Sequence, residues 1–156
     1  MPQGADEVAQ ALQRYADRGV FRGFSARRGR GGRLEFQFTW LTRRPMTLTY
    51  ESPRRALTFK NLLPGVGATP MLHRDLKALI EECRSRAVPA HKRIDARRAR
   101  LSTSTRHGHL SIALTVRGRH HEYAVQRGLS LVNDLFVLLR STYPDYLSEH
   151  FGLPAE

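Results

Sequence analysis

The sequence has almost no cysteine and no long hydrophobic run. Cys83 is the single cysteine among 156 residues, so no intrachain disulfide can form and a reducing, cytoplasmic setting is expected. No apolar run approaches the roughly 20 residues that a membrane-spanning helix needs. The start of the sequence also lacks the basic-then-apolar pattern of a signal peptide. We therefore expect residues 1–156 to form a single cytoplasmic domain with no membrane-spanning segment.

Lysine is also scarce, although the chain is strongly basic. Of its 26 basic residues only three, Lys60, Lys77 and Lys92, are lysines, which leaves 23 arginines against 14 acidic residues and a net charge of +12. A charge of this size raises the affinity for nucleic acid, an anionic lipid surface or an acidic protein patch. GC-rich coding also favours arginine over lysine without selection for binding, so a merely solvated surface is the second interpretation of the same composition.

Apolar residues at helical spacing predict the main helix of the core within residues 128–152. The positions that recur with this spacing are Leu129, Val132, Leu135, Phe136 and Leu139. Pro144 is expected to end this helix, because proline has no N–H to donate and restricts the residue before it. Two shorter helices are predicted, over residues 5–18 and from Pro70 to a point before Pro89.

Short segments in which apolar and polar residues alternate predict two runs of β-strands. The expected strands are 20–26, 34–40, 46–51 and 56–60 in the first run, and 101–104, 110–117 and 122–126 in the second. Short connections between such strands make neighbours antiparallel. The expected fold is therefore a two-layer α+β domain with the order α-ββββ-α-βββ-α, in which three helices cover one face of a mostly antiparallel sheet.

The face of the sheet that points away from the helices is predicted to be polar. Its residues are Thr39, Thr47, Thr49, Thr58, Lys60, Arg100, Ser102, Ser104, Arg106, Ser111, Thr115 and Arg117. The same alternation directs into the core the aromatic residues Phe36, Phe38, Trp40, Tyr50 and Phe59. Sheets that bind single-stranded nucleic acid stack the bases on exposed aromatic rings. The pattern therefore argues against base stacking and leaves contact with a phosphate backbone open.

Two arginine clusters are the candidate residues for binding an anion or nucleic acid. They are Arg27, Arg28, Arg30 and Arg33 in the Gly-rich loop 26–33, and Arg97, Arg98 and Arg100 in the most basic stretch of the chain, 84–106. We interpret the protein as a non-enzymatic basic binding module. Its leading candidate partner is the backbone of nucleic acid, bound with low sequence specificity.

The alternative function is a protein–protein or chaperone-like dimeric module that uses the C-terminal segment. Tyr143, Tyr146 and Phe151 are the candidate interface residues, since aromatic patches with few lysines are typical of interface cores. From Arg127 onward the chain has two basic and four acidic residues, so this end is acidic. In a competing interpretation, the same aromatic side chains fold back and cap the open end of the sheet.

No catalytic residue, metal site or cofactor is predicted. Cys83 lies on the apolar side of a predicted helix, where burial makes a thiol unreactive. The histidine pairs 107/109 and 120/121 flank opposite ends of the strand 110–117, roughly 25 Å apart, which is too far to share one ion. The Gly/Pro segment 62–70 joins a strand to a helix but lacks the Lys-Ser/Thr ending of a P-loop, so it is interpreted as a connector.

The order helix, strands, helix, strands, helix, closing on an apolar helix, resembles the class I type III secretion chaperones and their non-secretion bacterial relatives. This resemblance implies a dimeric module that binds protein rather than an enzyme. It spans most of the chain and rests on the order of the elements, so no site residue is carried over. The net charge of +12 is a departure, because such chaperones are typically acidic.

Overall fold

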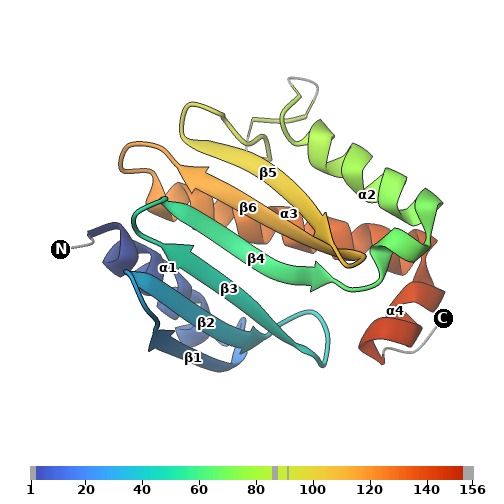
Figure 1. Cartoon of the computed structure of the whole chain (residues 1–156), viewed down its shortest axis with the longest axis horizontal. Helices are drawn as coiled ribbons and strands as arrows, with labels where there is room; N and C mark the ends of the chain where they lie inside the picture. Colours follow the sequence, from blue (N-terminus) through green and yellow to red (C-terminus); the bar gives the residue numbers. More distant parts are fainter. Residues whose placement is uncertain (1–2, 86–87, 91, 153–156) are drawn as a thin grey trace.

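A single antiparallel sheet organises the protein, whose structure is a computed structural model that describes residues 3–85, 88–90 and 92–152 (Figure 1). The strands are β1 (Arg22–Arg28), β2 (Arg33–Thr39), β3 (Pro45–Glu51), β4 (Ala56–Leu63), β5 (Ala99–Arg106) and β6 (His109–Val116). Their spatial order is β1-β2-β3-β4-β6-β5, and every neighbouring pair is antiparallel. The predicted α+β class with an antiparallel sheet is therefore confirmed.

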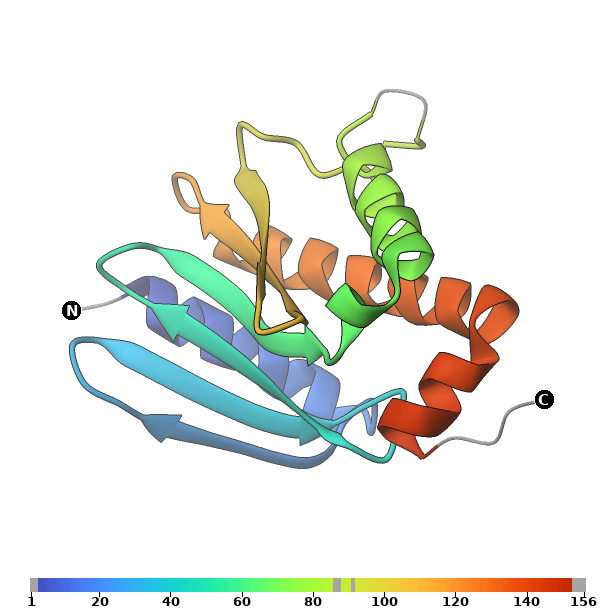
Figure 2. The same ribbon diagram turned by 45° about the vertical axis from the view of Figure 1, so that its right-hand side comes forward.

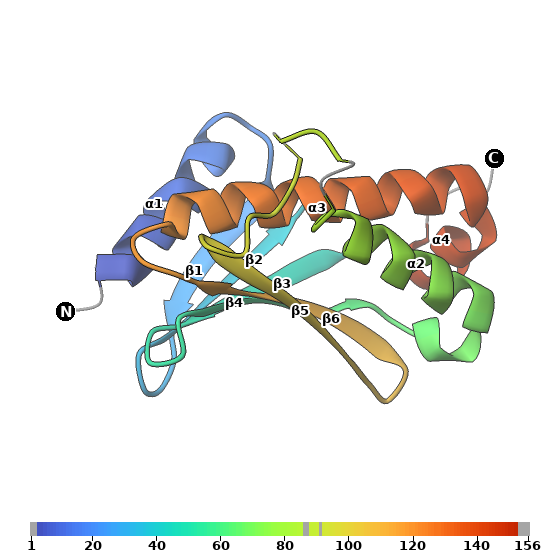
Figure 3. The same ribbon diagram turned by 90° about the horizontal axis from the view of Figure 1, so that it is seen from above.

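The helices lie on one side of this sheet and leave its other face uncovered (Figure 3). They are α1 (Gln3–Asp17), α2 (Pro70–Glu82), α3 (His121–Thr142) and α4 (Pro144–Phe151), with a short 3-10 helix, η1 (Val66–Ala68), before α2. Across the described ranges, none of the helices is both long and apolar enough to span a membrane.

Helix α3 forms the centre of the core, as the spacing of its apolar residues predicts. Leu135, Phe136 and Leu139 have no exposed surface, and burying each such side chain is worth about 1.5 to 3 kcal/mol as an upper bound. Gly128 brings the helix axis close to the sheet, because a Cβ at this position would lie 3.0 Å from a ring carbon of Phe59 and 3.1 Å from a methyl of Leu114.

The predicted strand 122–126 is wrong, since these residues form the first turns of α3. The alternation of Tyr123 and Val125 with polar neighbours is too short to separate a strand from a helix. In the structure the buried positions are His121, Ala124, Val125 and Gly128, which follow the helical spacing of three and four residues. The main helix therefore begins seven residues before its predicted start, at His121 instead of Gly128.

Pro144 ends α3, as predicted, but it also begins a further helix. Tyr143 is both the C-cap of α3 and the N-cap of α4. Pro144 lies in the first turn of α4, where a backbone N–H would have no acceptor within the helix, so the missing N–H of proline costs no hydrogen bond. The observed order is therefore α-ββββ-α-ββ-α-α in the described residues, with four α-helices instead of the predicted three.

The uncovered face of the sheet is polar, and its residues are aligned in rows across the strands. One row follows the strand register from edge to edge through Arg27, Glu35, Thr49, Thr58, Ala113 and Ser102. The opposite face carries Phe36, Phe38, Tyr50 and Phe59, all at most 2% exposed. The expected placement in the core is thus confirmed for these four rings, whereas Trp40 is half-buried and packs against the core. The open face carries small hydroxyl and methyl groups, of which Thr49 is buried, with arginine at its edge.

Candidate anion-binding site

Four connections between elements meet at one end of the sheet. The strand register at this end closes with a row formed by Arg33, Glu51, Ala56, Thr115 and Arg100. Beyond this row lie the β1–β2 turn (29–32), the β3–β4 turn (52–55), the β6–α3 turn (117–120) and the approach to β5 (95–98). Figures 1 and 2 show these connections on the same side of the molecule as the start of α1, with α2 and α4 on the other side.

Backbone hydrogen bonds join these connections one to the next. The N–H of Ser52 donates to the carbonyl of Gly32 over 3.2 Å, which joins the first two turns. The N–H of Val116 donates to the carbonyl of Arg55 over 2.8 Å, and the N–H of Arg117 donates to the carbonyl of Arg98 over 2.9 Å. The four segments therefore form a continuous edge instead of four independent loops.

This edge is built largely from arginine. Its ten arginines, which we call the arginine rim, are Arg28, Arg30, Arg33, Arg54, Arg55, Arg97, Arg98, Arg100, Arg117 and Arg119. Arg33 is half-buried and the other nine residues are exposed. With strands about 4.8 Å apart, six strands make the rim roughly 24 Å wide.

The rim unites the two arginine clusters that the sequence singled out. Six of the seven predicted anion-binding residues belong to it. The seventh, Arg27, lies one residue further along β1, where its guanidinium pairs with Glu35 over 2.6 Å across the strands. Arg27 and Arg28 are strand residues and not loop residues as predicted, because β1 runs to Arg28, two residues beyond its expected end.

Four rim residues are not among the predicted anion-binding residues: Arg54, Arg55 and Arg119, which the sequence did not single out, and Arg117, which was predicted only as part of the polar sheet face. They sit in two turns that are far apart along the chain and between the two predicted clusters in space. Each of these turns directly follows a predicted strand. Which turns lie at the same end of the sheet depends on how the antiparallel strands pair, and the sequence pattern does not predict that β4 pairs with β6.

The charge of the rim is only slightly compensated by carboxylates. The Asp95 carboxylate forms long ion pairs with the guanidinium groups of Arg97, at 3.4 Å, and Arg98, at 3.9 Å. The backbone N–H of Arg97, 2.9 Å from the Asp95 carboxylate, lowers the pKa of that group together with the two guanidinium groups. Among the residues that the structure describes, no carboxylate lies within 4 Å of the other eight guanidinium groups. Neighbouring arginines therefore repel one another within the Debye length of about 10 Å, unless an anion binds.

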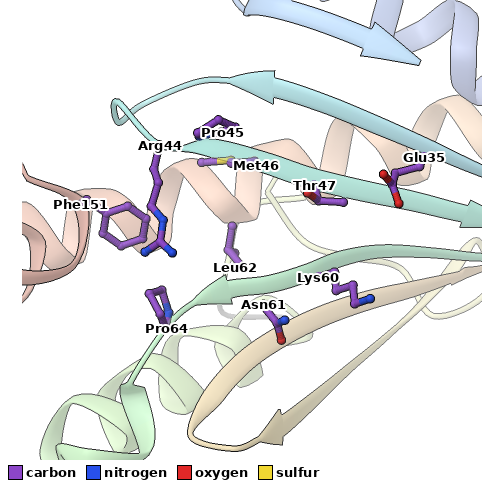
Figure 4. Close-up of a pocket in the computed structure, with 10 residues that line it drawn as sticks. All are labelled: Glu35, Arg44, Pro45, Met46, Thr47, Lys60, Asn61, Leu62, Pro64 and Phe151. Carbon is purple, nitrogen blue, oxygen red and sulfur yellow. The ribbon is translucent and has the colours of Figure 1, made fainter. Parts of the chain in front are cut away.

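A hollow of about 350 Å³ lies at the end of the open face opposite the rim (Figure 4). Arg44 reaches over it from the β2–β3 connection, and Lys60 lines it from β4. Arg44 donates to the backbone carbonyl of His150 over 3.1 Å and lies 5.9 Å above the centre of the Phe151 ring. This arginine thus connects the β2–β3 loop to α4, which accounts for its position without a ligand.

The candidate interface residues pack against the protein's own core. Tyr146 and Phe151 are 7% and 8% exposed, and the Phe151 ring meets Phe136 edge-on with a centroid distance of 5.4 Å. The Tyr146 hydroxyl donates to the carbonyl of Pro64 over 2.5 Å, and burial raises the pKa of Tyr146 far above its usual value. Half-buried Tyr143 donates a hydrogen bond to Asp75. The arrangement is that of the capping alternative, and an interface role for these residues stays a prediction.

The side chains that could hold a metal or act as a nucleophile are scattered. Within residues 3–85, 88–90 and 92–152, no three His, Cys, Asp or Glu side chains come together in a metal-binding group. Cys83 is buried, and that burial raises the pKa of its thiol.

Comparison with protein-family models, with curated proteins and with solved structures finds no match to this chain.

Proposed function

We propose that this protein is a non-enzymatic binding module that holds a polyanion against the arginine rim, and that the polyanion is the backbone of a nucleic acid. The observation that carries the proposal is the meeting of two arginine clusters, distant in sequence, with four further arginines on one edge. Eight of these ten guanidinium groups have no carboxylate within 4 Å in the described part of the chain.

The dimensions and chemistry of the rim suit a phosphate backbone. A duplex carries one phosphate per strand about every 3.4 Å of its axis, so a rim of roughly 24 Å matches the axial length of about seven base pairs. The planar guanidinium group can donate two parallel hydrogen bonds to one phosphate, which favours arginine over lysine in such contacts. The phosphates of a duplex, or of a single strand that follows the edge of the sheet, therefore offer hydrogen-bond acceptors along the length of the rim.

Low sequence specificity follows from the position of the aromatic rings. Phe36, Phe38 and Phe59 lie on the helix-covered face of the sheet and are at most 1% exposed, so none of these three rings is available for a base to stack on. Contacts to phosphate position a protein on nucleic acid and do not read its sequence. We expect affinity to depend on length and salt much more than on sequence.

Fluorescence anisotropy with labelled single-stranded and duplex oligonucleotides tests the proposal. A rim variant with Arg30, Arg54 and Arg117 changed to alanine is compared with a control variant in which Arg43, Arg106 and Arg140 are changed. All six residues are exposed, and each triple removes the same charge. The rim variant should bind at least about tenfold more weakly than the control, since each phosphate contact contributes to the electrostatic affinity. If neither the single-stranded nor the duplex oligonucleotide binds at low salt, the proposal is wrong.

The protein–protein alternative has less structural support. A surface for a protein partner normally includes a contiguous apolar patch. The large hydrophobic residues exposed in the described ranges are Val20, Met71 and Val137, and they lie on different elements. A chaperone-like dimer is therefore the second candidate, and the mass of the protein in solution decides it.

A further inference from the structure

A hollow of about 450 Å³ opens inside the rim, at the N-terminus of α3. Its lining residues are Gly4, Glu7, Tyr50, Ser52, Arg55, Gly118, Arg119 and His121. They come from α1, the end of β3, the β3–β4 turn, the β6–α3 turn and the start of α3, so the fold assembles this hollow from five segments. Two of its residues, Arg55 and Arg119, also belong to the arginine rim.

Two polar groups are buried at this hollow. His121 is only 5% exposed; its Nε2 lies 3.0 Å from the Tyr50 hydroxyl, and its Nδ1, which makes no hydrogen bond in the described residues, lies 3.5 Å from a carboxylate oxygen of Glu7. The hydroxyl oxygen of Ser52, in the same lining, is buried and has no hydrogen-bond partner in the described residues. Buried polar atoms are almost always satisfied, so the Ser52 hydroxyl indicates a missing polar group at this hollow.

Positive charge converges on the same place. Helix α3 has 22 residues, no side chain caps its N-terminus, and its first N–H groups have no acceptor within the helix. Arg55 is held in position because its guanidinium donates to the carbonyl of Gly118 in the turn before this helix. Arg119 is the next residue of this turn and, in the described structure, has no carboxylate within 4 Å.

Glu7 is the one acid in the lining, and its carboxylate oxygen lies 3.5 Å from His121 Nδ1. Its side chain is 44% exposed, so it can turn toward solvent. The two guanidinium groups and the helix N-terminus, which counts as about +0.5, outweigh this carboxylate. A phosphomonoester, with a charge of about −1.5 to −2, would bring the site close to neutrality.

We infer that this hollow binds the phosphate group of a phosphomonoester, with Arg55, Arg119 and the first N–H groups of α3 as its donors. The inference rests on the proposed function where it names the source: a terminal phosphate of the nucleic-acid strand that the rim holds. A free nucleotide or inorganic phosphate offers the same chemistry. The hollow would then select strand ends that carry a phosphate, which the rim alone cannot do.

The test compares two oligonucleotides of one sequence, with a 5′-phosphate or a 5′-hydroxyl, at equal salt. The phosphorylated strand should bind about tenfold more tightly, as expected for charge-assisted hydrogen bonds. Arg55→Ala and Arg119→Ala should each remove most of this preference. Their neighbours provide matched controls: Arg54→Ala and Arg117→Ala should weaken both oligonucleotides by the same factor and keep the preference. Glu7→Gln should increase the preference, because it removes the opposing charge.

Titration with inorganic phosphate, followed by the amide NMR signals of residues 119–123, separates the two proposals. Phosphate-induced shifts without binding of either oligonucleotide would support phosphate binding in the hollow and contradict nucleic-acid binding at the rim. Equal binding of both oligonucleotides, without phosphate-induced shifts, would contradict phosphate binding in the hollow and support nucleic-acid binding at the rim. If there is neither binding nor any shift, both proposals are wrong.

Discussion

The backbone N–H of Arg117 donates a hydrogen bond to the carbonyl oxygen of Arg98 over 2.9 Å, so two arginines from distant parts of the sequence are held side by side. A fold gains nothing by placing like charges at such an edge, because they repel each other. The same arrangement recurs at Arg55, whose carbonyl accepts from Val116 beside Arg117. Concentrated positive charge at this end of the sheet is the structural feature that any account of the function has to explain.

Repulsion within the rim should make stability depend on salt. We expect the melting temperature to rise as sodium chloride is increased from low to moderate concentration, since salt screens neighbouring guanidinium groups. The triple change of Arg30, Arg54 and Arg117 to alanine should raise the melting temperature at low salt and flatten its salt dependence. Calorimetry on this variant and on the Arg43, Arg106, Arg140 control measures the effect. Equal salt dependence in the two variants would contradict it.

His121 should make the protein less stable in mild acid. Burial lowers the pKa of His121 below its usual value of 6.5, with Arg55 and His120 adding to the effect and Glu7 opposing it. The unfolded chain therefore takes up a proton near pH 6.5 that the folded chain resists, and the free energy of unfolding falls as the pH drops below this value.

Urea titrations at pH 7.5 and 5.5, in a buffer free of phosphate, measure this dependence. His121→Gln should lose part of the pH dependence, whereas His120→Gln, at the exposed neighbouring position, should retain it. The interpretation fails if the His121 variant is as sensitive to pH as the unchanged protein.

The C-terminal aromatic side chains should contribute to stability more than to assembly. Phe151→Ala should reduce the free energy of unfolding by about 3 to 5 kcal/mol, the range for loss of a buried aromatic ring. Tyr143→Phe, which removes only the hydrogen bond to Asp75, should cost much less than the loss of the Phe151 ring. Urea unfolding gives both values. If Tyr146→Ala with Phe151→Ala instead converts a dimer to a still-folded monomer by light scattering, the interface hypothesis is correct.

Gly128 tests the close approach of α3 to the sheet. Gly128→Val places branched methyl groups where Phe59 and Leu114 already lie, and overpacking of this kind costs about 1 to 3 kcal/mol. Gln126→Val introduces the same residue on the exposed side of the same helix and should cost only about 0.5 kcal/mol in helix propensity. A Gly128 variant no less stable than the Gln126 control would show that the helix can move away freely.

The sequence predicted the elements of this fold better than their arrangement. Alternation over residues 34–40 and 110–117 located β2 and β6, because each strand has one buried and one open face. The prediction of a strand over residues 122–126 is wrong because five residues cannot separate the strand period from the helix period. The pattern around Pro144 predicts the end of one helix and does not predict the start of the next, although both roles follow from the missing N–H of proline.

The site was predictable in its parts and not as a whole. Arg30 and Arg97 stood out because they lie in dense local clusters of arginine, which a linear pattern reveals. Arg54 and Arg119 stand in short turns and belong to the rim only through the strand order, which joins β4 to β6 across the intervening α2 and β5. His121 could not be assigned from the sequence, since its burial depends on packing between α1, β3 and α3.

The salt dependence of nucleic-acid binding tests the central claim most directly. The slope of log K against log salt counts the phosphates that the protein neutralises, at about 0.9 per contact on duplex DNA. The account predicts that changing Arg30, Arg54 and Arg117 to alanine lowers this slope by up to about 2.7, whereas the Arg43, Arg106, Arg140 control leaves it nearly unchanged. Equal slopes for the rim variant and the control would contradict binding at the rim.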